Sequence, residues 1–384
     1  MREHPPPAQL RARVGPWLLR SLCKDPTLCI LLIALGLLGA LSPVPLGLYP
    51  TLVDWPTIAA LAGLLVLTKG VEASGGLHRL GLWLTGWMAT ERRAALCLVT
   101  AAALLSMLLT NDVALFVVVP LTLGLGRITS LPMVRMVVFE ALAVNAGSAL
   151  TPIGNPQNLF LWQLSHTSFA AFTRHMAPLV GFVMALLLLL TALSFQGRAL
   201  EKAPEGPAEA LDRPLLGLSL LLYAPFLWLT DLHQALWALA AVAAAMLVLR
   251  PKVLRDIDWP LLLVFVLMFV DLRLLAGLPP IRGLVAHYDL LQPQTLFLMG
   301  VTASQFISNV PAVIALAEYS QDWQMLAYAV NVGGFGLAIG SLANIIALRM
   351  AGGRKAWLLF HAYSVPFLLV TVAAVYAALF WFGR

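Results

Sequence analysis

Long apolar runs constrain this chain more than any other feature of its sequence. The runs Leu28–Leu48, Met176–Gln196 and Trp357–Phe382 approach or exceed the roughly 20 residues that a helix needs to cross the hydrocarbon of a bilayer. Of the 384 residues, 60% are hydrophobic and 11% charged, whereas soluble domains have about 45–50% and 25%. The sequence therefore predicts an all-α, polytopic membrane protein with the lipid bilayer as its solvent.

The formal charge of +6 indicates membrane orientation rather than nucleic-acid binding, because Lys and Arg lie between apolar runs. If the N-terminus is cytoplasmic, Lys and Arg concentrate in the loops predicted to lie inside, and few lie outside. We therefore predict a multi-pass protein of the bacterial inner membrane with its N-terminus cytoplasmic and its C-terminus periplasmic. The basic N-terminus followed by an apolar run also resembles a signal peptide, but a retained first helix fits the repeat described below. The predicted inside loops are 1–27, 79–93, 127–135, 198–213, 250–255 and 349–355.

The apolar segments are of three kinds. Continuous helices are predicted at 28–48, 56–77, 176–196, 215–230, 235–249, 259–278 and 357–382. Regions 94–126 and 292–318 each contain a polar Thr/Ser-Asn tip, which predicts a re-entrant hairpin that enters and leaves on one side. Segments 133–165 and 325–348 contain Gly, Asn and Pro, which predict broken helices.

The interruptions recur in pairs, which indicates an internal repeat. Asp54-Trp55-Pro56 matches Asp258-Trp259-Pro260, and the hairpin tip Thr110-Asn111 matches Ser308-Asn309. The segment NAGSALTPIGNPQN, which starts at Asn145, aligns without gaps to NVGGFGLAIGSLAN, which starts at Asn331. Identical positions include Asn145/Asn331, Gly147/Gly333, Gly154/Gly340 and Asn158/Asn344, and Asn155 is opposite Ser341.

The predicted topology places Asp54 outside and Asp258 inside, so the two repeats are expected to be inverted. Inverted repeats with paired interruptions are typical of secondary transporters, whose binding site lies at the interface between the repeats. The expected organisation is a cytoplasmic N-terminal segment at 1–27, a first repeat at 28–196, a linker with a connecting helix at 197–234, and a second repeat at 235–384.

Breaks at membrane depth predict a cavity, because an unpaired backbone N–H or C=O costs several kcal/mol in hydrocarbon. Helix N-termini at the breaks attract anions, whereas exposed carbonyls and amides can instead hold Na⁺. Two structural alternatives stay open: Ser, Thr and Asn at the tips can cap helices, and buried Asn can join helices. The candidate substrate-binding residues are Thr110, Asn111, Asn145, Gly147, Ser148, Thr151, Asn155, Ser308, Asn309, Asn331, Gly333 and Ser341.

Asp112 breaks the symmetry of the tips, because Val310 is its counterpart. A carboxylate at membrane depth is costly, so proton or cation coupling is one expectation for Asp112; stabilisation of a helix N-terminus is the other. For Lys69 with Glu72, and for Asp271 with Arg273, we expect ion pairs within each helix or snorkelling toward the interface.

Two of these segments resemble the arsenite permease and citrate transporter-like families of the ion transporter superfamily. They are LLTNDVALFVVVPL (108–121) and NAGSALTPIGNPQNLFLW (145–162). The resemblance implies transport of an oxyanion such as arsenite, or of a carboxylate such as citrate, by an elevator-like motion. It assigns to one half-site Thr110, Asn111 and Asp112, with Asn145, Gly147, Thr151 and Asn155. It assigns to the other Ser308, Asn309, Asn331, Gly333 and Ser341. The tips depart from the Ser-Asn-Thr of the sodium–dicarboxylate branch, which favours proton coupling.

Three functions compete on these observations. The first is a proton-coupled anion transporter, and the second is a Na⁺/H⁺ antiporter of the same superfamily. The third, a membrane-embedded enzyme, is disfavoured because no nucleophile–base pattern or metal-ligand spacing is found. No cofactor and no metal are expected. Energy would come from an H⁺ or Na⁺ gradient or from a separate ATPase subunit, because no phosphate-binding GxxxxGK[ST] loop is present. A homodimer is left open, as is the identity of the anion.

Overall fold

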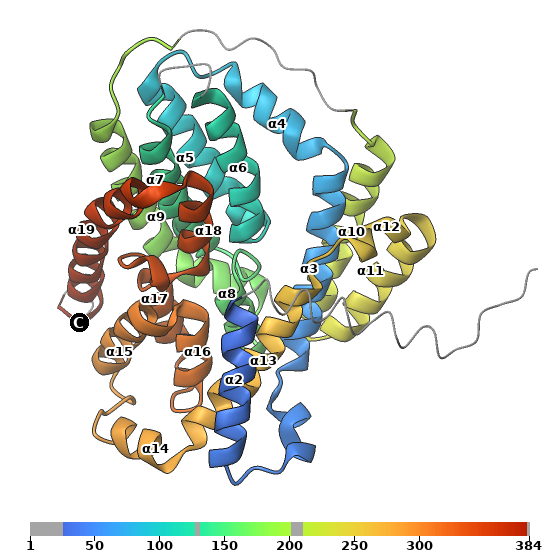
Figure 1. Cartoon of the computed structure of the whole chain (residues 1–384), viewed down its shortest axis with the longest axis vertical. Helices are drawn as coiled ribbons and strands as arrows, with labels where there is room; N and C mark the ends of the chain where they lie inside the picture. The colour runs from blue at the N-terminus through green and yellow to red at the C-terminus, as the bar shows by residue number, and fades with distance from the viewer. Residues whose placement is uncertain (1–25, 127–130, 201–209, 382–384) are drawn as a thin grey trace, which may run out of the picture. The chain divides into compact units, whose positions relative to one another are not determined.

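The computed structural model describes residues 26–126, 131–200 and 210–381, and these form helices and one isolated bridge (Figure 1). Five of the described helices are long and apolar enough to cross a membrane, which confirms the prediction of an all-α, polytopic membrane protein. They are α3 (Trp55–Ala73), α9 (Phe169–Ser194), α10 (Arg213–Asp231), α13 (Trp259–Gly277) and α19 (Gly353–Phe380). The predicted N-terminal segment 1–27 lies almost wholly outside the described residues, as does part of the predicted linker.

The chain divides into two compact units, of which the smaller contains residues 26–54 and Asp258–Val285. In this unit α13 packs against α2 (Pro26–Leu41), the short 3-10 helix η1 (Leu46–Leu52) and α14 (Pro279–Val285). The predicted helix 28–48 is wrong in its second half. Helix α2 ends at Leu41 because Pro43 and Pro45 follow, and proline supplies no backbone N–H for a continuing helix.

Two polar residues of α13 do not pair with each other as expected. The Arg273 guanidinium donates from Nη1 to the carbonyl of Leu52 at 2.7 Å. Both carboxylate oxygens of Asp271 are buried and make no hydrogen bond in the described chain. In α3, by contrast, Lys69 and Glu72 form the predicted ion pair at 3.0 Å.

The larger unit holds the remaining described residues, including the three-helix group α3, α10 and α11 (Ala235–Leu249). Small residues let α3 and α10 approach closely. A methyl group on Gly63 would lie 2.2 Å from the Phe226 ring, and one on Gly70 would lie 2.2 Å from Ser219 Oγ. Two short helices, α4 (Gly76–Thr85) and α12 (Pro251–Arg255), were not predicted.

Both predicted hairpins and both predicted broken helices are present in the larger unit. The hairpins are α5 (Glu91–Leu108) with α6 (Asn111–Gly126), and α15 (Pro293–Ile307) with α16 (Asn309–Ala317). The first broken helix consists of α7 (Met133–Ser148) and α8 (Pro156–Ser165). The second consists of α17 (Trp323–Val332), the 3-10 turn η2 (Ala338–Gly340) and α18 (Leu342–Ala351). Helix α7 packs against α5, α6, α9, α18 and α19, and so forms the centre of this unit (Figure 1).

Loops predicted to share the cytoplasmic face contact one another in the larger unit. Thr90 pairs with Ala199 in the isolated bridge, and Glu91 N donates to the Arg198 carbonyl at 2.9 Å. Asp212 N donates to the Ser74 carbonyl at 2.9 Å. The loops are therefore grouped here as the charge pattern groups them.

The turns that follow α8 and α10 also contact one another. Phe169 N donates to Asp231 Oδ1 at 2.5 Å, and the His166 and His233 rings meet edge to face at 4.7 Å. His166 and His233 both have positive φ, 52° and 59°, and each lies where the chain turns after a helix. These contacts join the ends of α8 and α10 to the start of α9.

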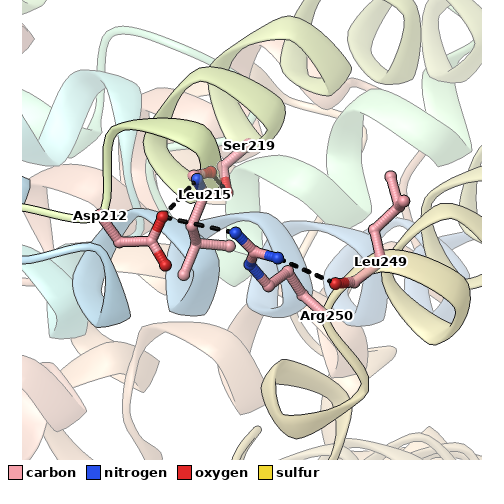
Figure 2. Close-up of polar contacts among 5 residues, drawn as sticks. All are labelled: Asp212, Leu215, Ser219, Leu249 and Arg250. Carbon is pink, nitrogen blue, oxygen red and sulfur yellow. Dashed lines mark hydrogen bonds and ion pairs between the residues drawn. The ribbon is translucent and has the colours of Figure 1, made fainter.

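Asp212 has two roles at the start of α10, as Figure 2 shows. Its Oδ1 accepts from Leu215 N at 3.0 Å, which caps the helix, and it lies 3.5 Å from Arg250 Nη2. Arg250 also donates to the Leu249 carbonyl at the end of α11. The contact fixes the end of the linker to two helices, although an ion pair this exposed contributes little free energy.

Candidate functional site

Two asparagine pairs join the two broken helices. Asn145 Nδ2 donates to Asn344 Oδ1 at 2.7 Å, and Asn331 Nδ2 donates to Asn158 Oδ1 at 2.7 Å. Asn145 aligns with Asn331, and Asn158 aligns with Asn344, so the two hydrogen bonds are equivalent under the repeat alignment. All four side chains are at most 4% exposed. The breaks that the sequence predicted separately therefore form a single polar centre.

Each asparagine is also bonded within its own broken helix. Asn145 and Asn331 donate to the carbonyl four residues earlier, at 3.0 and 2.8 Å. Asn344 donates to the Gly334 carbonyl at 2.9 Å, and Asn158 donates to carbonyls of the first break at 3.1 to 3.4 Å. The bonds from Asn158 and Asn344 satisfy carbonyls at the breaks, which have no intrahelical partner. The four amides thus hold the breaks together, which is the structural alternative considered for buried Asn.

Asn155 and Ser341, which align with each other, differ in what they do. Asn155 Oδ1 accepts from Asn158 N at 2.9 Å and caps α8, while its Nδ2 lies 3.2 Å from Ser148 Oγ and 3.1 Å from Asn331 Oδ1. Ser341 precedes α18 and makes no side-chain cap bond. The first break is therefore closed by side-chain hydrogen bonds, whereas the start of α18 keeps its backbone N–H groups uncapped by a side chain.

The two hairpin tips reach the same polar centre. Asn111 N donates to the Gly154 carbonyl, in the first break, at 2.9 Å. A methyl group on Gly334 would lie 3.2 Å from Asn309 Nδ2 and 3.7 Å from Asn145 Oδ1, which places the second tip beside both breaks. Asn111 and Asn309 are 4% and 2% exposed.

The residues beside the tip asparagines differ in their exposure and in whether they cap a helix. Thr110 is buried, whereas Ser308 and Asp112 are partly exposed. Ser308 has a φ of 72° and forms no side-chain cap on α16. Capping therefore does not explain the serine of the second tip.

Each hairpin is also bonded to the break of its own repeat, at aligned positions but with different groups. In the first repeat Thr151 Oγ1 donates to the Met107 carbonyl at 2.6 Å. In the second repeat Gln305, which aligns with Met107, donates from Nε2 to the carbonyls of Gly333 and Phe335 at 2.6 and 3.0 Å. Gln305 Oε1 also accepts from Leu337 N, at the position that aligns with Thr151, at 2.8 Å. Gln305 escaped prediction because its counterpart is apolar.

Gly147 and Gly333 allow hairpin and broken helix to touch. A methyl group on either glycine would lie 2.6 Å from a serine hydroxyl, that of Ser106 in α5 or that of Ser304 in α15. These glycines were predicted to line the site, and here they permit close packing at equivalent places in the two repeats.

The electrostatics of the centre come from backbone and amide groups. Helices α6, α8, α16 and α18 all begin at a tip or a break, and helix N-termini carry a partial positive charge. Turn residues 109–112, 149–155, 308–309 and 333–341 contain no Lys or Arg. A small pocket beside Asn331 is lined otherwise by apolar residues such as Leu179 and Phe335, so it lacks the donors that an anion needs.

Glu140 and Thr122 are buried polar residues that the sequence reasoning missed. Both are 0% exposed, and Thr122 Oγ1 of α6 donates to Glu140 Oε1 of α7. Glu140 is the only acid between 133 and 165, but it lies in an apolar stretch before the Gly, Asn and Pro residues that indicate the break.

Helices long and apolar enough to cross a membrane, two helical hairpins and two broken helices joined at a polar centre are features of a membrane transporter. A family model described as "Citrate transporter" matches residues 17–329. The chain belongs to this citrate transporter family.

Named relatives agree with this assignment. The inner membrane protein YbiR of Escherichia coli is 48% identical over 91% of this chain and 94% of its own length. An uncharacterized transporter of Methanocaldococcus jannaschii, MJ0456, is 30% identical over 93% of this chain and 99% of its own. The silicon efflux transporter LSI3 of rice is 33% identical over 36% of this chain and 29% of its own.

Proposed function

We propose that this protein is a secondary active transporter of a small anion, an inorganic oxyanion or a carboxylate, and that the anion binds where the breaks and tips meet. The observation that carries the proposal is the crossed pair of asparagine bonds, Asn145 to Asn344 and Asn331 to Asn158. The pair brings two helix breaks and two tips to one buried place, which is where transporters built from repeats bind their substrates.

The donors at this place suit an oxyanion or a carboxylate better than a large organic cation. The amides of the four asparagines are occupied by protein acceptors. The N-termini of α16 and α18 have no side-chain cap, and each begins next to a serine hydroxyl, Ser308 or Ser341. Backbone N–H groups at a helix start, together with hydroxyls, bind anions without a cationic side chain. The substrate is therefore proposed to contact the second repeat through these serines and Asn309, and the first repeat through Asn111.

Alternating access is proposed to be elevator-like, with the repeats inverted across the membrane. Supporting this, each hairpin is bonded to its own broken helix, by Thr151 in one repeat and Gln305 in the other. The hairpins and broken helices would then move together and carry the anion with them. Coupling is proposed to be to H⁺, with Asp112 beside the first tip as the coupling carboxylate.

A Na⁺/H⁺ antiporter is the second candidate, and buried acids favour it. Glu140 is fully buried in the larger unit, and amide and carbonyl oxygens, which coordinate Na⁺, surround the breaks. The two candidates differ in what crosses the membrane, so the same reconstituted protein separates them.

The test is uptake into proteoliposomes that contain the purified full-length chain. Labelled citrate, arsenite and silicate are offered under an imposed pH gradient, an imposed Na⁺ gradient or neither. Anion transport predicts accumulation of at least one anion, driven by pH, and its loss in Asn309→Ala. The control variant is Asp212→Asn, since asparagine also caps helices and Asp212 lies away from the breaks. Exchange of Na⁺ for H⁺ without any anion flux would overturn the anion proposal in favour of the antiporter.

A further inference from the structure

Glu140 is a buried acid with almost no partners. It is 0% exposed, and the hydroxyl of Thr122 gives it the single hydrogen bond that the described chain provides, at Oε1. Its Oε2 is buried and has no hydrogen-bond partner in the described chain. Helix α6, which carries Thr122, is the returning arm of the first hairpin, and α7, which carries Glu140, is the first half of a broken helix.

No cation compensates this carboxyl. The ion pairs of Lys69 with Glu72 and of Arg250 with Asp212 do not involve it. On α7 itself, Arg135 donates from Nη1 to the Ser194 carbonyl and lies over the Phe195 ring. The helices packed against α7 contribute further titratable groups, and none bonds to Glu140: Glu91, Arg92, Arg93 and Cys97 on α5; Asp112 on α6; Arg174 and His175 on α9; Arg349 on α18; and Arg354, Lys355, His361, Tyr363 and Tyr376 on α19.

Burial of Glu140 without a nearby cation determines its protonation state in this conformation. An isolated carboxylate in an apolar interior costs far more free energy than the neutral acid, which loses only ordinary hydrogen bonds. Glu140 is therefore held here as the neutral acid. Ionisation requires water or a cation to reach Oε2, and this needs α6 and α7 to move apart.

The position of Glu140 connects it to the proposed substrate site. It precedes Asn145 by little more than one helical turn on α7, and Asn145 belongs to the crossed asparagine pairs. The aligned position in the second repeat is Leu326, which is fully buried and apolar. Because leucine packs at the aligned position of the second repeat, packing alone does not require an acid at position 140.

We propose that Glu140 is a proton-binding site of the transport cycle, distinct from Asp112. It holds H⁺ as the neutral acid in the conformation described here and releases it, as a carboxylate plus H⁺, in a conformation that admits water between α6 and α7. The proposal rests on the transport function proposed above. By linkage, a group whose proton affinity depends on conformation couples the proton to whatever else selects that conformation.

The first experiment needs no substrate, so it stays decisive if the proposed transport function fails. Infrared difference spectra of purified protein are recorded between low and high pH for the native chain, Glu140→Gln and Thr122→Val. The proposal expects a carboxylic-acid C=O band in the native protein that is lost in Glu140→Gln. In Thr122→Val, which keeps the acid but removes its hydrogen bond, the band should move to higher frequency. A band unchanged in Glu140→Gln would overturn the proposal.

The second experiment tests coupling in proteoliposomes. With an anion that the native protein transports, Glu140→Gln should reduce pH-driven accumulation by about tenfold or more, within the usual range of coupling factors, while exchange at equal pH continues. Accumulation equal to that of the native protein would overturn a role in coupling. Thermal unfolding of each variant in detergent shows that the proteins compared are folded. Thr122→Val serves as the variant of choice if Glu140→Gln does not fold.

Discussion

Asn145 in the first broken helix donates to Asn344 in the second over 2.7 Å, and the aligned pair, Asn331 and Asn158, repeats this bond at the same distance. A bond that recurs under the sequence alignment cannot be shifted in one repeat without a mismatch in the other. The pairs therefore fix the register of the two breaks relative to each other. This relationship separates residues that hold the centre together from residues that are available to a substrate.

Asn331 belongs to the first group, and we expect Asn331→Ala to destabilise the protein. The change leaves Asn158 Oδ1 and Asn155 Nδ2 without the partner that Asn331 provides. Each buried group left unsatisfied costs about 1–3 kcal/mol, so the unfolding temperature in detergent should fall clearly. An unfolding temperature equal to that of the native chain would show that water replaces the lost bonds.

Asn309 belongs to the second group, so Asn309→Ala should reduce transport more than stability. Its side chain lies beside Gly334 and Asn145, and it forms no bond comparable to those of Asn331. Uptake should be lost while the unfolding temperature stays close to that of the native chain, and Asn111→Ala should behave in the same way. Normal uptake by both variants would mean that the tips serve only as turns.

Gly147→Ala and Gly333→Ala should each push a hairpin away from its broken helix. A methyl group at either position would lie 2.6 Å from Ser106 Oγ or Ser304 Oγ, well inside contact distance. We expect destabilisation of about 1–3 kcal/mol, as for other overpacked sites, seen as a lower unfolding temperature. Gly217→Ala is the matched control, because a methyl group at Gly217 meets nothing within 4 Å.

Asp112→Asn tests coupling at the first tip. Asn keeps the size of the side chain but cannot bind and release a proton, so pH-driven accumulation should be lost while exchange without a gradient continues. The comparison with Glu140→Gln is informative. If both residues bind the coupled proton, loss of either one should reduce pH-driven accumulation. Full pH-driven accumulation by Asp112→Asn would leave Asp112 as an acid that stabilises the start of α6.

Asp212→Ala should cost about 1 kcal/mol through loss of the cap on α10, whereas Asp212→Asn should cost much less. Asn can still accept from Leu215 N, and it loses only the exposed pair with Arg250 at 3.5 Å. Unfolding in detergent compares the two variants. Equal losses would show that the ion pair, and not the cap, carries the stabilisation.

The sequence predicted the hairpins and breaks well because Asn, Gly and Pro stand out in an apolar background. The tip at Asn111 and the first break before Pro156 lie where they were predicted. Helix α4 was missed because ten residues are too few to register as a span. Gln305 and Glu140 each align with an apolar residue, Met107 and Leu326, and neither lies at a tip or a break, so neither the paired polar positions nor the interruptions indicate them.

The two hairpins are bonded to their breaks by different numbers of hydrogen bonds, and this difference predicts which hairpin opens more readily. Two hydrogen bonds hold the first hairpin to its break, from Thr151 Oγ1 to the Met107 carbonyl and from Asn111 N to the Gly154 carbonyl. Gln305 alone forms three hydrogen bonds between the second hairpin and its break. Separating the first hairpin from its break therefore loses two of these bonds, and separating the second loses three. If the two hairpins open separately as gates, the first is expected to separate from its break more readily than the second.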